Sequence, residues 1–326
     1  MARANAAYYA SRDPFRDFIT APEISQVFGE LLGAWAAVAW NAMGSPARVL
    51  LAEAGPGRGT LMSDALRLAR RVSPSFAAAA RVHLVETSLR LRQAQAAALA
   101  GLLADPPCWH DRIDALPDGP LLLFGNEFLD ALPVRQLLRR PGGWDERFVL
   151  NGRFVLRDGP VPPAPLLGRA VAPGEVLEWN PDAMDAVRHL AGRIVRDGGA
   201  ALLLDYGPDR PGHGDTLQAL RDGKPCDPLD GPGTADLTAH VDFPALAGVA
   251  AEAGARVQGP VGQGAFLSSL GLWPRTEQLA RQQPPEQARA LVDAAHRLSA
   301  PDRMGRLFKV MAVRDPRLPP LPGFEA

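Results

Sequence analysis

Two hydrophobic patterns alternate along the chain. One is a continuous apolar run that ends in a polar turn, and the other is a stretch in which apolar residues recur with the period of an α-helix. Four runs are unbroken enough to be buried strands of a parallel sheet, and they lie at Val49–Glu53, Arg81–Glu86, Gly119–Gly125 and Ala200–Leu204. Helical periodicity follows, in stretches such as Thr60–Val72, Ser88–Leu103 and Asp182–Val195. Strands that alternate with helices predict an α/β protein with a doubly wound sheet.

Smaller elements flank this pattern. A helix is predicted over Thr20–Trp40, with a capping box at its start. Between residues 134 and 156, apolar and polar residues alternate and Asn151-Gly152 is a typical hairpin turn. This pattern predicts a small inserted antiparallel β-hairpin. The stretch Gly207–Gly233 is rich in glycine and proline and predicts a long loop with a short helix at Thr216–Arg221.

Three glycines at alternate positions follow the first strand. The strand ends in Glu53, and Gly55, Gly57 and Gly59 lead into a helix that begins at Thr60. Glycines reach positive φ and let a ligand approach the backbone, and a helix start offers free N–H groups to an anion. A strand, a glycine turn and a helix in this order predict a nucleotide-binding site. The alternative is a tight strand-to-helix connection that binds nothing.

The spacing of the glycines narrows the choice of ligand. The pattern is G-x-G-x-G without a following G-K-[ST], which argues against a phosphate-binding loop. The second strand ends in Glu86, an acid that can accept hydrogen bonds from ribose hydroxyls, and its separation from the glycines exceeds the roughly 20 residues usual for NAD. S-adenosylmethionine (SAM) fits better, with its amino-acid end at the glycine turn and its ribose at Glu86.

A second polar stretch, NEFLDALP, directly follows the strand Gly119–Gly125. Ligands bind at the carboxyl ends of strands in open α/β sheets. Glu127 and Asp130 are three residues apart and share a face if the stretch is helical. A helix capped by Asn126, with both acids near its positive end, is the simpler interpretation, and a site for a cation is the functional one.

Two aromatic side chains are further candidates. Trp109 follows a short apolar stretch, where it either flanks an adenine ring or packs in the core. His240 lies within AHVDF, and a lone histidine is more often a packing or capping residue than a catalytic one.

The composition limits the classes of partner. The 326 residues are 47% hydrophobic and 22% charged with a net charge of −1, so no global field attracts nucleic acid or an anionic membrane. Cys108 and Cys226 lie far apart without a metal-site spacing, and we expect no metal. No run reaches the ~20 apolar residues of a membrane helix, and Met1–Ala10 lacks the core of a signal peptide. We expect a cytoplasmic protein without membrane insertion.

Taken together, ten stretches resemble the MidA-like SAM-dependent methyltransferases, a family that includes a mitochondrial complex I assembly factor that methylates arginine. They cover nearly the whole chain in the family's order, and they are YYASRDPF, DFITAPEISQVFGELLG, EAGPGRGTLMSDALR, LVETSLRLRQ, NEFLDALPV, LLLDYG, DTLQALRDGK, ADLTAHVDF, GPVGQGAFLSSLG and MGRLFKVMAV. The resemblance implies the seven-stranded class I SAM-dependent methyltransferase fold with extra helices, and SAM as methyl donor. We divide the chain into an N-terminal arm and helix (1–45) and a methyltransferase domain (46–326) with insertions at about 134–180 and 208–305.

The resemblance also implies roles for individual residues. Glu53 and the three glycines would surround the methionine end of SAM, Glu86 its ribose, and Thr20 and Asp17 would approach from the arm. The full set of expected cofactor-binding residues is Glu53, Gly55, Gly57, Gly59, Thr60, Glu86, Thr87, Trp109, Thr20 and Asp17. The expected substrate is an arginine side chain of a protein, such as a respiratory-complex subunit.

Paired carboxylates suit an arginine substrate because they can bind a guanidinium bidentately and orient one nitrogen. Glu127 and Asp130 are the candidates for this clamp, and Asn126 would shape the floor beneath the cofactor. Two departures from the family lie nearby: a Gly-rich insert is absent before Asp17, and a helical segment is absent before Tyr8. They motivate one alternative, an assembly or binding protein that retains the fold and turns over weakly.

Other enzyme classes remain open on the same scaffold, because fold does not fix function. A methyltransferase acting on a small molecule or on RNA is the next alternative, and the near-neutral charge argues against RNA. An NAD dehydrogenase fits the glycine spacing poorly. A homodimer is considered as the oligomeric state.

Overall fold

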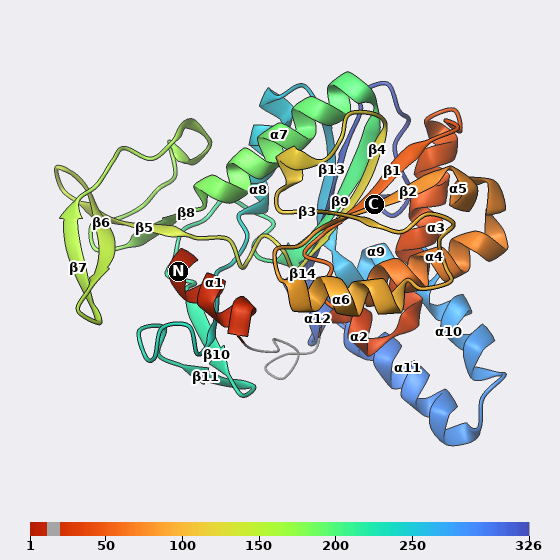
Figure 1. Cartoon of the computed structure of the whole chain (residues 1–326). Helices are drawn as coiled ribbons and strands as arrows, with labels where there is room; N and C mark the ends of the chain where they lie inside the picture. Colours follow the sequence, from red (N-terminus) through yellow and green to blue (C-terminus); the bar gives the residue numbers. More distant parts are fainter. Residues whose placement is uncertain (12–19, 326) are drawn as a thin grey trace.

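A seven-stranded mixed sheet lies at the centre of the protein in the computed structural model, which describes residues 1–11 and 20–325 (Figure 1). In spatial order its strands are β13 (Arg256–Gly262), β14 (Phe308–Arg314), β9 (Gly199–Tyr206), β4 (Leu121–Asn126), β1 (Val49–Ala54), β2 (Ala80–Val85) and β3 (Cys108–His110). Neighbouring strands from β9 to β3 are parallel, and β14 is antiparallel to both β9 and β13. The predicted doubly wound α/β fold is confirmed.

Helices cover both faces of this sheet, as the unbroken apolar strands require. Alternate residues of β4 point to opposite faces: Leu122 and Phe124 join one core, and Leu121 and Leu123 join the other. The first core is closed by α3 (Gln26–Ala42), α4 (Thr60–Val72), α5 (Pro74–Ala79), α9 (Gln263–Ser269), α10 (Leu272–Ala280) and α11 (Pro285–Ser299). The second is closed by α7 (Pro181–Asp197), α8 (Phe243–Glu252) and the short helices η2 (Ile113–Ala115) and η3 (Ala164–Leu166).

The predicted helix Thr20–Trp40 is in fact two helices. Helix α2 (Ala21–Ile24) ends at Ser25, which has extended backbone (φ −155°) and caps α3 by accepting a hydrogen bond from Val27 N. The predicted capping box is wrong, because the Thr20 side chain makes no cap. The Glu23 carboxylate instead accepts a hydrogen bond from the Thr60 hydroxyl at 2.5 Å and joins α2 to the start of α4.

The segment from 134 to 180 forms a separate four-stranded antiparallel sheet, which projects from the central sheet on the left of Figure 1. The predicted hairpin is part of it, and the spatial order is β7 (Arg153–Asp158), β6 (Gly143–Leu150), β5 (Arg135–Arg140) and β8 (Val176–Trp179). Leu137 and Leu177 are buried and join the core beneath α7 and α8. This packing attaches the insert to the central domain.

The predicted short helix at Thr216–Arg221 is wrong. A three-stranded sheet occupies this region, with β10 (Gln218–Arg221) between β11 (Lys224–Cys226) and β12 (Asp236–Thr238). Asp222 and Gly223 both have positive φ (51° and 71°), the geometry of a two-residue hairpin turn. Helix α1 (Ala2–Ser11) lies beside β12, because Asn5 donates a hydrogen bond to Leu237 O.

Two further helices complete the described chain, α6 (Leu89–Ala98) and α12 (Met304–Leu307). Within the ranges 1–11 and 20–325, no helix combines the length and apolarity needed to cross a bilayer. The proposed second insertion, 208–305, contains the β10–β12 sheet, and it also contains α8 and β13, which pack in the central domain. The division into an arm and a methyltransferase domain stays a prediction.

Candidate active site

A cavity of about 460 Å³ opens at the carboxyl ends of β1, β2 and β4, where ligands bind in open α/β sheets. Side chains from α1 and from the start of α2 complete its wall. The expected site residues that line it are Thr20, Glu53, Gly55, Gly57, Thr60, Glu86, Thr87, Asn126 and Glu127. Gly59, Trp109 and Asp130 are not among its lining residues, and Asp17 lies outside the described residues.

The glycine turn has the conformation that the sequence predicts. Gly55, Gly57 and Gly59 have φ values of 66°, 53° and 84°. This is the left-handed region, which residues with a side chain rarely adopt. Gly59 directly precedes α4, and a Cβ there would lie 3.3 Å from the Gln95 Cα. The Gln95 amide in turn donates a hydrogen bond to Gly57 O at 2.8 Å. Helix α6, which contains Gln95, therefore packs against the glycine turn and stabilises it.

Glu53 presents an unsatisfied acid beneath this turn. Its side chain is buried, its carboxyl accepts a hydrogen bond from Met62 N, and Oε2 has no partner among the described residues. Burial raises the pKa of Glu53 to about 8. A buried acid with a free oxygen suits a cation, and the amino-acid end of SAM has an ammonium group. The residues present therefore fit the methionine end of SAM.

Glu86 lies at the carboxyl end of the neighbouring strand. Its Oε1 accepts a hydrogen bond from Ser88 N at 2.7 Å, and its Oε2 accepts one from the Gln95 amide at 3.3 Å. Burial raises the pKa of Glu86, although these hydrogen bonds oppose the shift. The carboxylate is thus fixed in place beside Thr87, and its role as the ribose acceptor stays a prediction.

Trp109 packs against the first core and hydrogen-bonds to α6. It lies within β3, is half-buried against the first core, and donates its indole hydrogen to Gln95 Oε1 at 2.8 Å. This contact supports α6, which holds the glycine turn. A direct contact with adenine stays a prediction.

The stretch NEFLDALP is not a helix. Strand β4 extends to Asn126, and Glu127 has a positive φ of 49°, which a helix does not allow. The following backbone folds around a buried acid from β9: the N–H groups of Leu129 and Asp130 donate hydrogen bonds to Asp205 Oδ2 at 3.0 and 3.2 Å. The prediction failed because these amides bond to a distant carboxylate and not to carbonyls of a helical turn.

This loop brings several acids together. The half-buried Glu127 accepts hydrogen bonds from Ala21 N at 3.1 Å and from the Asn126 amide at 3.3 Å. Burial raises its pKa to about 7, and burial also raises the pKa values of Asp130 and Asp205, which lie close enough for their charges to interact. Among the residues that the structure describes, no Lys or Arg forms an ion pair with these three acids. We call Glu127, Asp130, Asp205 and the nearby Asp236 the acid cluster.

Sequence reasoning missed part of this cluster. Tyr206 hydrogen-bonds Asp130 through its side chain, and the Tyr9 hydroxyl donates to Asp236 Oδ1 at 2.8 Å. Asp205 could have been found, because it ends an apolar strand in the same way as Glu53 and Glu86. Asp236 and Tyr9 show no such pattern, since only the tertiary fold brings α1 beside β12. The buried Asn126 Oδ1 has no hydrogen-bond partner within residues 1–11 and 20–325, which leaves an acceptor there beside Glu127.

Curated relatives match almost the whole chain. It is 37% identical over 344 residues to the protein arginine methyltransferase NDUFAF7 homolog, mitochondrial, of Drosophila melanogaster, a match that covers 94% of this chain and 78% of that protein. It is 36% identical over 337 residues to the mitochondrial protein arginine methyltransferase NDUFAF7 of Homo sapiens, covering 94% and 76%.

Both relatives are named as mitochondrial proteins. The prediction of a cytoplasmic location is therefore wrong by this comparison. It rested on composition and on the missing core of a signal peptide, and neither property identifies a compartment inside the cell.

Solved structures confirm the class I methyltransferase fold. A COG1565 superfamily member from Burkholderia thailandensis, bound to S-adenosyl-homocysteine, superposes with a TM-score of 0.74 at 29% identity, over 95% of this chain and 80% of that chain. A second crystal structure of a COG1565 superfamily protein from that organism gives a TM-score of 0.76 at 28% identity, over 99% and 88%. The homodimer stays a prediction.

A family model described as S-adenosyl-L-methionine-dependent methyltransferase matches residues 31–261, which include the glycine turn, Glu86 and the acid cluster. The family model, the relatives and the lining residues of the cavity agree with the resemblance seen in the sequence. The chain therefore belongs to this family of SAM-dependent methyltransferases, and SAM is its methyl donor.

Proposed function

We propose that the protein methylates the guanidinium nitrogen of arginine side chains in other proteins. The observation behind the proposal is the acid cluster, in which Glu127, Asp130 and Asp205 have no Lys or Arg partner among the described residues, next to a cavity that fits SAM. Buried acids that have hydrogen bonds but no paired positive charge favour a bound cation. The names of the relatives, protein arginine methyltransferases, support the same substrate.

A guanidinium matches this cluster better than an ammonium does. It is planar and always charged, and it can donate two parallel hydrogen bonds to a carboxylate. Glu127 lines the cavity, and Asp130 lies buried behind the lining, where a bound guanidinium would favour its ionised form. We assign the clamp to these two acids.

The residues of the chain then have distinct tasks in the reaction. When bound, SAM supplies a methyl group on a positively charged sulfur. Glu127 and Asp130 orient the guanidinium so that one nitrogen points at that methyl, within the ~3–3.5 Å that displacement requires. Tyr206 fixes the Asp130 carboxyl by a hydrogen bond, and Asp205 fixes the loop backbone. Glu127, with a pKa of about 7, can take the proton that the nitrogen loses on methylation.

The test uses Glu127→Gln, which keeps the shape of the side chain and removes its charge. The assay measures methyl transfer from labelled SAM to randomised 11-residue peptides with one central arginine, with matched peptides that have a central lysine as control. We expect methylarginine from the first set only, and about 100-fold less in the variant, with SAM affinity within about twofold by calorimetry.

Two results would contradict the proposal. Equal turnover in Glu127→Gln and the unsubstituted protein would remove Glu127 from the clamp. SAM binding without transfer to any arginine peptide would favour the alternative of an assembly or binding protein that retains the fold.

A further inference from the structure

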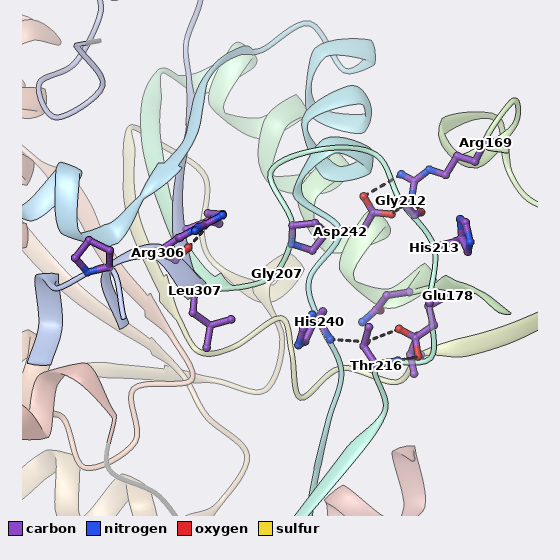
Figure 2. A pocket seen from close by; sticks show the side chains of 16 residues that line it. Arg169, Glu178, Gly207, Gly212, His213, Thr216, His240, Asp242, Arg306 and Leu307 are labelled. Atoms are coloured by element: carbon purple, nitrogen blue, oxygen red, sulfur yellow. Dashed lines mark hydrogen bonds and ion pairs between the residues drawn. The ribbon is translucent and has the colours of Figure 1, made fainter. Parts of the chain in front are cut away.

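A second cavity, of about 530 Å³, is lined in part by Val134, which directly follows the NEFLDALP loop. Figure 2 shows this cavity. Its lining residues come from the segment after β9, from the end of β8, from the residues before α8, and from α12 with the start of β14. Figure 2 shows Arg306 and Leu307 on one side, Arg169 and His213 on the opposite side, and His240 between them. The SAM site does not use this cavity.

Consecutive residues of the chain line the two cavities. Leu132 and Pro133 line the first cavity, and Val134, the next residue, lines the second. Tyr206 links the two through its side chain, because it hydrogen-bonds Asp130 and its ring packs edge-on against the His240 ring with centroids 5.5 Å apart. A chain that occupied the second cavity would thus lie within one side-chain layer of the acid cluster.

Several charged groups that line the second cavity already have partners within the protein. Arg169 forms an ion pair with Asp242 at 2.5 Å. Glu178 accepts hydrogen bonds from Thr216 N at 3.0 Å and from the Gln136 amide at 2.8 Å. These groups are satisfied by other residues of the chain and do not need a ligand.

On the side of the second cavity formed by α12 and β14, the charged groups are less completely paired. Lys309 is 7% exposed, donates to Arg306 O at 2.6 Å, and lies 3.5 Å from the exposed carboxylate of Asp209. The Arg306 side chain is exposed, and none of the described residues forms an ion pair with its guanidinium. Among the described residues, the cavity therefore has the unpaired positive charge of Arg306 beside the buried, paired charge of Lys309.

We propose that this cavity binds the stretch of substrate polypeptide next to the target arginine, and that Arg306 pairs with an acidic side chain in that stretch. The inference rests on the proposed function and specifies its substrate class: an arginine with an acid nearby in sequence. The two sites act together, since the acid cluster takes the positive side chain and Arg306 takes the negative one. Such opposed charges fix the direction in which the chain lies.

The test is a peptide series with a fixed central arginine in an 11-residue Gly/Ala/Ser background. A single Glu is placed at each other position in turn, and two matched series have Gln or Lys there. We expect Glu at one or two neighbouring positions to raise kcat/KM about tenfold over Gln through a lower KM. Arg306→Glu should abolish this preference and favour Lys at the same position, and Arg306→Gln should abolish it without reversal.

Arg303→Glu is the matched control, because Arg303 lies three residues away, is exposed, and does not line the cavity. It should retain the preference for Glu, and all three variants should bind SAM as the unsubstituted protein does. Methylation of the peptides without any positional preference, or an unchanged preference in Arg306→Glu, would overturn this inference and leave arginine methylation standing. SAM binding with no peptide methylated would overturn both.

Discussion

The hydroxyl of Tyr9 donates a hydrogen bond to Asp236 Oδ1 at 2.8 Å, between residues 227 positions apart in sequence. This bond joins α1 to the acid cluster. Asn5 strengthens the connection, since its amide donates to Ala131 O and to Leu237 O, both at 2.8 Å, and its Oδ1 accepts from Leu237 N. Helix α1 is thereby held as a wall of the SAM cavity and not as a loose arm.

Asn5→Ala should weaken SAM binding about tenfold, because it removes three hydrogen bonds that hold α1 against the cavity, each worth about 1 kcal/mol. Calorimetric titration with SAM measures the effect. Arg3→Ala, an exposed residue of the same helix, is the control and should bind as before. Equal affinity in both variants would show that α1 does not contribute to binding.

The pH dependence of turnover should depend on Glu127. The clamp requires an ionised carboxylate, and burial sets the pKa of Glu127 in the free protein at about 7. The kcat/KM for an arginine peptide should therefore rise between about pH 6 and 8. The corresponding measurement on Glu127→Gln should give a low and nearly flat profile over that range. A rise of the same size in the variant would assign the titration to another group.

Glu53 should make the free protein less stable as the pH rises. Its pKa is about 8 in the folded state against 4.5 for an ordinary glutamate, so between these values the folded state binds more protons than the unfolded state. The free energy of unfolding should fall over this window, by up to about 1.4 kcal/mol per pH unit from this group.

Glu53→Gln should reduce that slope and weaken SAM binding at least tenfold, because Gln cannot ionise to pair with the ammonium group of SAM. Urea unfolding at pH 5 and pH 8 measures the slope. Glu252→Gln, at an exposed position in α8, is the control and should leave the slope unchanged. A slope that Glu53→Gln does not alter would mean that Glu53 is ionised in the folded protein.

Gly59→Ala should reduce SAM affinity by about an order of magnitude. The substitution strains a backbone with φ of 84° and presses a methyl group against Gln95, which holds both Gly57 and Glu86. Gly44 is a close control, since its φ is 81° and a methyl group there would have no neighbour within 4 Å. Both variants should lose similar stability on heating, and only Gly59→Ala should lose affinity for SAM.

The sequence alone predicts the central sheet and most of the SAM site, because their patterns are local. An apolar run that ends in an acid identifies the strands ending near Glu53 and Glu86, and alternate glycines identify the turn. The same pattern, an apolar strand that ends in an acid, also identifies Asp205. The Asp222-Gly223 hairpin likewise has a local pattern, which the composition of the surrounding loop concealed.

The acid cluster could not be predicted in the same way, because its geometry depends on tertiary contacts. Glu127 and Asp130 fit a helical face by spacing, but Asp205 captures the backbone amides that a helix would use. Asp236 and Tyr9 meet only after α1 has docked on β12. The helix prediction for NEFLDALP thus placed Glu127 and Asp130 near each other but on the wrong backbone, and their role stays a prediction.

The position of β14 affects how the protein is made. Synthesis proceeds from the N-terminus, so β9 is complete long before Phe308–Arg314, the strand that pairs with its free side. Until β14 emerges from the ribosome, the open side of β9 exposes unpaired backbone groups to other chains. Release of the chain before residue 308 would leave that side permanently open, and we expect such fragments to aggregate and not to accumulate as smaller folded enzymes.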